Sequence, residues 1–340
     1  MDIKELDTNA AAMVAQGKGI LAADESTGTI KKRFDKIGLE SSFESRRAYR
    51  ELLFTAPDAG KYISGVILYD ETLRQQAADG KPFPQLLAEH GILPGIKVDA
   101  GAKPLPGFPG ETVTEGLDGL RERLAEYRGL GARFAKWRAV IDIGAGIPTR
   151  ACLAANAEAL ARYAALCQEA TIVPIVEPEV LMDGDHTIER CEEVTDAALE
   201  AVFDALFLHR VRLEGMVLKP NMVISGKKCA KQAAPRQVAE ATIRCLRRRV
   251  PGAVPGIAFL SGGQSETDAT LHLSLMNRQG DLPWELSFSY GRALQQSTLD
   301  AWKGKPGNVA AAQKAFLRRA RLNGLARDGS YEPAMEQAAA

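Results

Sequence analysis

Ile172-Val-Pro-Ile-Val-Glu-Pro-Glu179 is a short apolar run that ends in two carboxylates, and a helical pattern follows it over residues 188–208. A nearly continuous apolar run of this length is typical of a strand that is covered on both faces. A polar loop and a helix after such a strand are typical of the repeating unit of a parallel sheet. Pro174 is the weak point of this interpretation, because a proline in a central strand removes one ladder hydrogen bond.

The same unit recurs along the chain. Including residues 172–176, eight strands are predicted, at residues 19–23, 65–69, 95–98, 133–137, 172–176, 215–218, 256–260 and 285–289. Helical periodicity occurs between them, for example at residues 154–169, 188–208, 235–249 and 266–277. Eight alternating units predict an α/β protein with a single (β/α)8 TIM barrel, extra helices and a short C-terminal tail.

No linker or change in composition divides the chain of 340 residues, so we expect one domain over residues 1–340. Glycine and proline interrupt residues 103–110, which predicts a surface loop. After Arg327 the sequence becomes small and polar, and residues 328–340 are expected to form a mobile tail.

The charge and the apolar pattern exclude several classes of partner. Lysine plus arginine and aspartate plus glutamate both number 43, so no overall charge attracts nucleic acid or an anionic membrane. Arg247-Arg-Arg249 is interpreted as a solvated helix end. No apolar stretch reaches the ~20 residues that span a bilayer, and residues 1–19 lack a signal-peptide pattern. We therefore expect a cytoplasmic protein with no membrane or nucleic-acid partner.

Cysteine and histidine give no metal signature. The cysteines are odd in number, scattered and without a C-x-x-C pair, which predicts reduced thiols that are mostly buried: Cys152, Cys167, Cys191, Cys229 and Cys245. The histidines lack ligand spacing: His90, His186, His209 and His272. His186 is expected to make a loop hydrogen bond. No metal and no cofactor is predicted.

Polar residues gather at the predicted strand ends, where barrels of this kind place their active sites. They are Asp24, Ser26, Thr29, Lys97, Asp99, Lys136, Arg138, Glu177, Glu179, Lys219, 261–264 and 290–292. Residues two apart on one strand face the same side, so Lys136 pairs with Arg138 and Glu177 with Glu179. Lysine is rarely buried without a partner, and three lysines at strand ends indicate a shared site.

Lys219 is the predicted nucleophile. Pro220 follows it and Pro178 follows Glu177, and a residue before proline is held in extended conformation, so both are expected on the last residue of a strand. A neutral lysine amine attacks a ketone and forms an iminium. Lys136 is a neighbouring cation expected to lower the pKa of Lys219. Glu177 and Asp24 are the carboxylates available to move protons.

Two anion sites are predicted around this lysine. Loops after the seventh and eighth strands often bind phosphate, and here they supply Ser261, Gly262, Gly291 and Arg292 before helices. A second site is expected across the barrel from Ser26, Thr29, Arg33 and Lys97. Two such sites imply a substrate phosphorylated at both ends.

Seven segments, in order between about Gly17 and Ala326, resemble the class I fructose-bisphosphate aldolase family. They are residues 19–28, 95–99, 134–138, 172–179, 218–222, 260–264 and 288–294. The resemblance implies a TIM-barrel lyase without metal or cofactor. Such an enzyme reversibly cleaves fructose 1,6-bisphosphate to dihydroxyacetone phosphate and glyceraldehyde 3-phosphate in glycolysis and gluconeogenesis. It also implies a homotetramer.

The resemblance further implies residue roles. Lys219 would form the Schiff base, Glu177 would be the main general acid and base, and Asp24 and Lys136 would assist proton transfer; Glu179 is counted with this catalytic group. The phosphate of the aldehyde half would contact Ser26, Arg33, Lys97 and Arg138, with Thr29 in place of the common serine. Ser261, Gly262, Gly291 and Arg292 would hold the phosphate of the dihydroxyacetone half. The family's terminal tyrosine is missing after Tyr331, so we expect activity to persist, with protonation of the enamine either slower or carried out by another group.

Three alternatives remain at this point: a zinc-dependent aldolase, another Schiff-base lyase such as a transaldolase or a deoxyphosphogluconate aldolase, and a non-catalytic phosphosugar-binding barrel. The zinc enzyme needs convergent histidines, and a non-catalytic barrel needs neither Lys219 nor Glu177. Preference among fructose 1,6-bisphosphate, fructose 1-phosphate and sedoheptulose 1,7-bisphosphate stays open.

Overall fold

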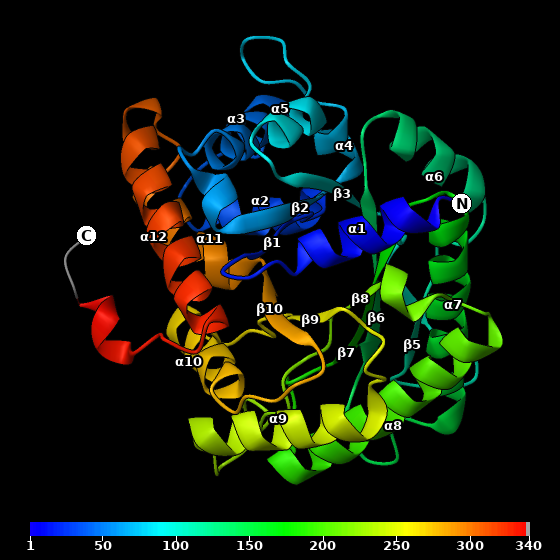
Figure 1. The fold of residues 1–340 in the computed structure, drawn as a ribbon. Coiled ribbons are helices and arrows are strands. Elements are labelled where there is room, and N and C mark those ends of the chain that lie inside the picture. The colour runs from blue at the N-terminus through cyan, green and yellow to red at the C-terminus, as the bar shows by residue number, and fades with distance from the viewer. Residues whose placement is uncertain (338–340) are drawn as a thin grey trace.

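A computed structural model describes residues 1–337 and shows a closed barrel of eight parallel strands (Figure 1). The strands are hydrogen-bonded in the order β1-β10-β9-β8-β7-β6-β3-β2, so chain neighbours are also spatial neighbours. Their bounds are β1 (Gly19–Ala23), β2 (Ile63–Leu68), β3 (Leu93–Lys97), β6 (Phe134–Ile141), β7 (Val173–Val180), β8 (Val217–Leu218), β9 (Gly256–Phe259) and β10 (Glu285–Tyr290). The predicted (β/α)8 fold is confirmed.

Helices surround the barrel. They are α1 (Ile3–Met13), α2 (Thr27–Asp35), α3 (Phe43–Phe54), α4 (Asp70–Leu73), α5 (Phe83–Glu89), α6 (Leu120–Gly129), α7 (Arg150–Glu169), α8 (Ile188–Leu208), α9 (Pro235–Arg249), α10 (Glu266–Asn277), α11 (Arg292–Trp302) and α12 (Val309–Arg327). Short 3₁₀ helices are η1 (Ala59–Lys61), η2 (Leu213–Gly215), η3 (Pro306–Asn308) and η4 (Pro333–Glu336). Within the described chain, no helix is both long enough and apolar enough to cross a membrane.

The interior of the barrel is apolar at the end where the strands begin. Alternate residues of each strand face inward, and those of this half form one buried cluster with the inner face of α1: Leu6, Ala10, Met13, Val14, Ile20, Ala22, Ile67, Phe134, Val173, Ile175, Val217 and Ala258. Figure 1 shows α1 lying across the strands. The barrel is therefore a packed core closed by a helix at one end, and a site can form only at the other.

Phe134 shows how this half is filled. A Cβ on Gly95 would lie 2.2 Å from its ring, and a Cβ on Gly65 would lie 2.9 Å from it. The glycines of β2 and β3 therefore leave the space that this one large side chain occupies. Substituting either glycine would overfill the core.

β7 is longer than predicted, and this corrects the expectation that Glu177 ends a strand. The strand runs through Pro174 and Pro178 to Val180. The carbonyl of Val176 accepts a hydrogen bond from the Lys219 amide at 2.8 Å, so even-numbered residues of β7 direct their amide groups toward β8. Because β8 has only two residues, the missing N–H groups of both prolines face the side where few partners exist.

Other boundaries also differ from the prediction: β6, for example, runs to Ile141 instead of ending at Trp137. Residues 213–215, which border the start of the predicted strand 215–218, form a 3₁₀ turn instead. Part of the loop predicted at residues 103–110 is strand β4 (Ala102–Pro104), which pairs antiparallel with β5 (Thr112–Thr114). A strand of three residues gives no periodicity, so composition alone indicated a loop.

The predicted tail is folded as far as the structure describes it. Tyr331 is fully buried, and its carbonyl accepts hydrogen bonds from Ser274 at 3.1 Å and Arg278 at 2.6 Å. Glu336 accepts a hydrogen bond from the Tyr331 hydroxyl at 2.8 Å and forms an ion pair with Arg319. Tyr331 and Glu336 thus attach this segment to α10 and α12, whereas most of its other residues are exposed. The remaining part of that prediction, residues 338–340, lies outside the described residues.

Other exterior predictions have mixed outcomes. Four of the five cysteines are buried, and Cys229 is half-buried, which confirms their placement as mostly core residues. Two of the arginines at the end of α9 form ion pairs with α8. Arg248 pairs with Glu192 at 3.2 Å, and Arg249 pairs with Asp196 at 2.6 Å. Their charges join α9 to α8.

Candidate active site

Every residue predicted for the site lines one cavity of about 470 Å³ at the end where the barrel strands finish. These residues are Asp24, Ser26, Thr29, Arg33, Lys97, Lys136, Arg138, Glu177, Glu179, Lys219, Ser261, Gly262, Gly291 and Arg292. A larger cavity of about 800 Å³ lies on the outside of α12, and none of these residues reaches it. The barrel therefore brings together residues that are up to 268 positions apart, Asp24 and Arg292.

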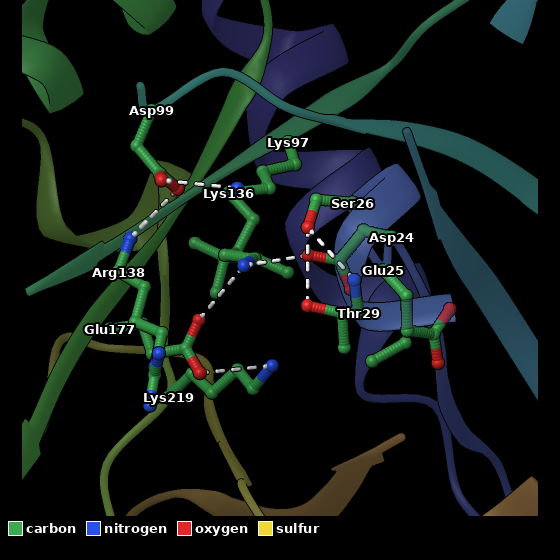
Figure 2. A network of polar contacts seen from close by, with 12 residues as sticks. Asp24, Glu25, Ser26, Thr29, Lys97, Asp99, Lys136, Arg138, Glu177 and Lys219 are labelled. Atoms are coloured by element: carbon green, nitrogen blue, oxygen red, sulfur yellow. Dashed lines mark hydrogen bonds and ion pairs between the residues drawn. The ribbon is translucent and has the colours of Figure 1, made fainter. Parts of the chain in front are cut away.

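Four charged side chains form the centre of the site (Figure 2). Lys219 Nζ lies 3.2 Å from Glu177 Oε1, and Lys136 Nζ lies 3.6 Å from Glu177 Oε2. Lys136 Nζ also contacts Asp24 Oδ2 at 2.7 Å. Both lysines and Glu177 are at most 4% exposed, so these charges are removed from water and compensated only by one another.

This compensation fixes the charge state of two members. Burial opposes ionisation of Asp24, but Lys136, Lys219 and Lys97 outweigh it and hold the pKa of Asp24 well below its ordinary value. Burial likewise disfavours the Lys136 ammonium, but Asp24, Glu177 and Asp99 raise its pKa above the ordinary range. Lys136 is therefore a fixed cation and Asp24 a fixed anion at neutral pH.

Glu177 differs from Asp24 in its free oxygen. Its Oε2 is buried and has no hydrogen-bond partner in the part of the chain that the structure describes. A buried carboxylate oxygen without a donor is costly in an empty site and available to a substrate or a water. This oxygen distinguishes Glu177 from Asp24, whose Oδ2 contacts the Lys136 ammonium at 2.7 Å.

A second charged group lies on β3 and β6. Asp99 accepts hydrogen bonds from the amides of Gly101 at 3.1 Å and Arg138 at 3.4 Å, and it lies 3.4 Å from Lys97 Nζ. Arg138 pairs with Glu179 on the neighbouring strand, and although burial opposes its charge, Glu179 raises its pKa. Lys97 and Arg138 thus provide cations that are oriented by carboxylates.

The start of α2 forms the third part. Ser26 is the N-cap of this helix: its hydroxyl accepts from the Thr29 amide at 3.4 Å and lies 3.1 Å from the Thr29 hydroxyl. Glu25 pairs with Arg33, and with Arg50 at 2.6 Å. Although burial opposes it, the two arginines lower the pKa of Glu25, so Arg33 is anchored by an ionised carboxylate.

Arg33, which was predicted for the anion site of Ser26, Thr29 and Lys97, also lies near the loop after β10. A Cβ on Gly291 would lie 3.7 Å from Arg33 Nη2, so Arg33 borders the loop predicted for the other phosphate. The reason is topological: β1 pairs with β10, so the loops that follow these two strands are neighbours. Sequence order cannot show this closure of the barrel.

The loop after β9 has two consecutive residues with left-handed backbone, Gly262 at φ 49° and Gly263 at φ 75°. Only glycine adopts such a pair without strain. Gly291 is the N-cap of α11 and Arg292 its first residue. Backbone amides at these turns and at a helix N-terminus attract an anion.

Several cavity residues were not predicted: Glu25, Lys32, Lys36, Ser289 and Gln296. Ser289 could have been found, because it lies two residues after Ser287 on the inward face of β10, and its hydroxyl is buried without a partner within residues 1–337. Lys32 follows Thr29 by three residues and Lys36 follows Lys32 by four, which puts the three on one helix face.

Histidines take no part in this cavity. His272 Nδ1 lies 2.6 Å from Gln264 Oε1, and burial lowers its pKa to about 4 despite Asp268. The loop hydrogen bond predicted for His186 is wrong: neither buried ring nitrogen has a partner among residues 1–337. A Cβ on Gly184 would lie 3.0 Å from Nδ1 and a Cβ on Gly226 would lie 3.1 Å from Cε1, so the ring packs beside these two glycines. The described residues contain no group of three or more metal-binding side chains.

Comparison with known proteins shows which family this chain resembles. The model of the family Glycolytic, described as fructose-bisphosphate aldolase class-I, matches residues 5–340. A probable fructose-bisphosphate aldolase class 1 of Xanthomonas campestris pv. campestris is 60% identical over 333 residues, which cover 98% of this chain and 100% of that relative. The cytoplasmic isozyme of fructose-bisphosphate aldolase from Spinacia oleracea is 56% identical over 329 residues, covering 96% of this chain and 92% of its own.

A solved structure agrees with these matches. Fructose-bisphosphate aldolase from Plasmodium falciparum, in complex with TRAP and a small-molecule inhibitor, superposes with a TM-score of 0.96 at 52% identity. The match covers 97% of this chain and 95% of that one.

Proposed function

The chain belongs to the class I fructose-bisphosphate aldolase family, and from that premise we propose that Lys219 is its Schiff-base lysine and Glu177 its main proton-transfer group. The contact of 3.2 Å between Lys219 Nζ and Glu177 Oε1, buried inside the barrel end, carries this proposal. The zinc-dependent, transaldolase-type and non-catalytic alternatives are set aside by membership of this family.

Formation of the Schiff base uses these two residues. Glu177 takes a proton from Lys219, and the neutral amine attacks the C2 ketone of the substrate. The adduct moves a proton from nitrogen to oxygen, and Glu177 then protonates the hydroxyl, which leaves as water. The products of this step are an iminium on Lys219 and an ionised Glu177.

Cleavage follows from the iminium. Glu177 accepts the proton of the C4 hydroxyl, the C3–C4 bond breaks, and its electron pair moves toward the nitrogen to give a neutral enamine and the free aldehyde. Asp24 remains ionised, so we assign it to accept a hydrogen bond from the C4 hydroxyl and to hold Lys136 as a cation. Protonation of the enamine at C3 and hydrolysis release dihydroxyacetone phosphate.

The two ends of the cavity support a bisphosphate substrate, fructose 1,6-bisphosphate. We assign Ser261, Gly262, Gly291 and Arg292 to the phosphate of the dihydroxyacetone half. The phosphate of the aldehyde half is assigned to Ser26, Thr29, Lys97 and Arg138, and Arg33 borders both groups. Glu179 acts here through Arg138, which it pairs and orients.

We also propose a homotetramer, one domain over residues 1–340 and a cytoplasmic location. Phe207 and Leu208, at the end of α8, are 87% and 75% exposed, and an adjacent pair of large exposed apolar side chains favours a subunit contact. The name of the Spinacia oleracea relative supports the location. Analytical ultracentrifugation tests the assembly: a monomer at micromolar concentration would contradict it.

Borohydride reduction tests the chemistry. With dihydroxyacetone phosphate and EDTA present, we expect a stable adduct on the peptide that contains Lys219, identified by mass spectrometry. An adduct on Lys136 or Lys97 would reassign the nucleophile, and no adduct at saturating ligand would overturn the Schiff-base mechanism.

A further inference from the structure

Lys227 lies beside the loop assigned to the dihydroxyacetone phosphate, although no motif includes it. A Cβ built on Gly263 would lie 2.7 Å from Lys227 Nζ and 2.8 Å from Arg292 Nη2. The ends of two cationic side chains therefore converge on one point next to a glycine of the phosphate loop. A side chain at position 263 would displace both of them.

The backbone of Lys227 is held firmly. Its amide donates to the carbonyl of Met182 at 2.7 Å, and the amides of Gly226 and Lys228 donate to the carbonyls of His186 at 2.9 Å and Gly184 at 3.0 Å. A Cβ on Gly226 would lie 2.3 Å from the Gly184 carbonyl oxygen, so the loops after β7 and β8 are in direct contact. This contact directs the Lys227 side chain toward the loop after β9.

The charge around Gly263 is unbalanced. Lys227 Nζ pairs with Asp183 Oδ1 at 2.7 Å, and both side chains are partly exposed. Among residues 1–337, no carboxylate forms an ion pair with Arg292. Two cations with one carboxylate leave a positive charge beside Gly263, and an anion at this point would neutralise it.

We propose that Lys227 is a further phosphate-binding residue, which grips the phosphate of the dihydroxyacetone half together with Arg292. On binding, its ammonium exchanges Asp183 for the phosphate dianion or bridges the two. In the empty site, Asp183 holds the Lys227 ammonium in place. In the complex, Asp183 competes with the phosphate for that ammonium and so weakens phosphate binding. This assignment rests on the proposed function of the Ser261–Gly263 loop.

The test uses the full chain and dihydroxyacetone phosphate, which has only one phosphate. The concentration for half-maximal borohydride trapping on Lys219 is measured for the wild type, Lys227→Met and Lys228→Met. Lys228 is the matched control, because it is the adjacent exposed lysine and loses the same charge. We expect Lys227→Met to raise that concentration about threefold to tenfold, as for loss of a half-exposed charge-assisted hydrogen bond, and to lower kcat/KM for fructose 1,6-bisphosphate by a similar factor. Lys228→Met should change it less than about twofold.

A second variant predicts the opposite sign. Asp183→Asn removes the competitor and should lower the half-maximal concentration about twofold to threefold. Equal effects of Lys227→Met and Lys228→Met, or none from Lys227→Met, would overturn the role of Lys227. Arg292→Met separates the two proposals: if it weakens trapping while Lys227→Met does not, only the Lys227 assignment fails. If neither does, the assigned location of the phosphate fails with it.

Discussion

The two halves of the barrel interior are built from the same strands and differ only in which residues face inward. On β7, Val173 and Ile175 lie in the apolar half, and Glu177 and Glu179 follow two and four residues later on the same face. On β6, Phe134 is followed by Lys136. The apolar half excludes water by close packing, and the charged half is then stable only through compensation between its own charges. The apolar half that stabilises the barrel and the charged half that lines the cavity are thus only two residues apart along each of these strands.

The largest effect is expected in the charged half. Lys219→Met removes the proposed nucleophile and preserves its bulk, so kcat should fall on the order of 10⁴- to 10⁶-fold, as for loss of other covalent nucleophiles. Without the Lys219 ammonium, the Glu177 carboxylate still has the Lys136 ammonium as a neighbour, so the fold should persist. Steady-state kinetics with circular dichroism as the folding control measure this. Residual activity above one per cent would mean that another amine is the nucleophile.

Glu177→Gln keeps the shape of the side chain and removes its proton-transfer capacity. General acid–base catalysis contributes about 10²- to 10⁴-fold, so kcat should decrease within that range while the KM changes little. Single-turnover trapping should show slower formation of the adduct on Lys219. A decrease confined to KM would indicate that Glu177 only binds substrate.

Phe134→Ala tests the apolar half. The ring fills the space left by Gly65 and Gly95, and its loss should lower the free energy of unfolding by about 3–5 kcal/mol. Ile175→Val, on the strand that also holds Glu177, is the milder control and should cost about 0.5–1.5 kcal/mol. Urea unfolding measures both. If kcat of the folded Phe134→Ala enzyme falls more than tenfold, the two halves are not separable.

His272 shows the fate of a buried titratable group that lacks a charged partner at contact. Burial lowers its pKa to about 4, whereas in the unfolded chain it titrates near the ordinary value of 6.5. Between these pH values the unfolded chain binds more protons, so the free energy of unfolding should fall as pH decreases from 6.5 to 4, by up to about 3 kcal/mol.

The matching variant for this pH dependence is His272→Gln, which places a non-titrating amide beside Gln264 in place of the imidazole. Its stability should depend less on pH than that of the wild type over the same interval, as measured by urea unfolding at half-unit steps. Parallel curves for the two proteins would show that His272 is protonated equally in the folded and unfolded states.

The sequence by itself determined the eight-stranded barrel and the residues at the strand ends. An apolar run followed by a charged residue on the same strand face is a local pattern, and parallel strands in a closed barrel all end on one side, which is why Asp24, Lys136, Glu177 and Lys219 were predicted together. Neighbour relations between loops were decided by the tertiary structure. Arg33 lies beside Gly291 because β1 pairs with β10, and Lys227 lies over Gly263 because two backbone-linked loops direct it there. Neither contact has a sequence signal, since both depend on closure of the barrel and on hydrogen bonds between segments far apart in the chain.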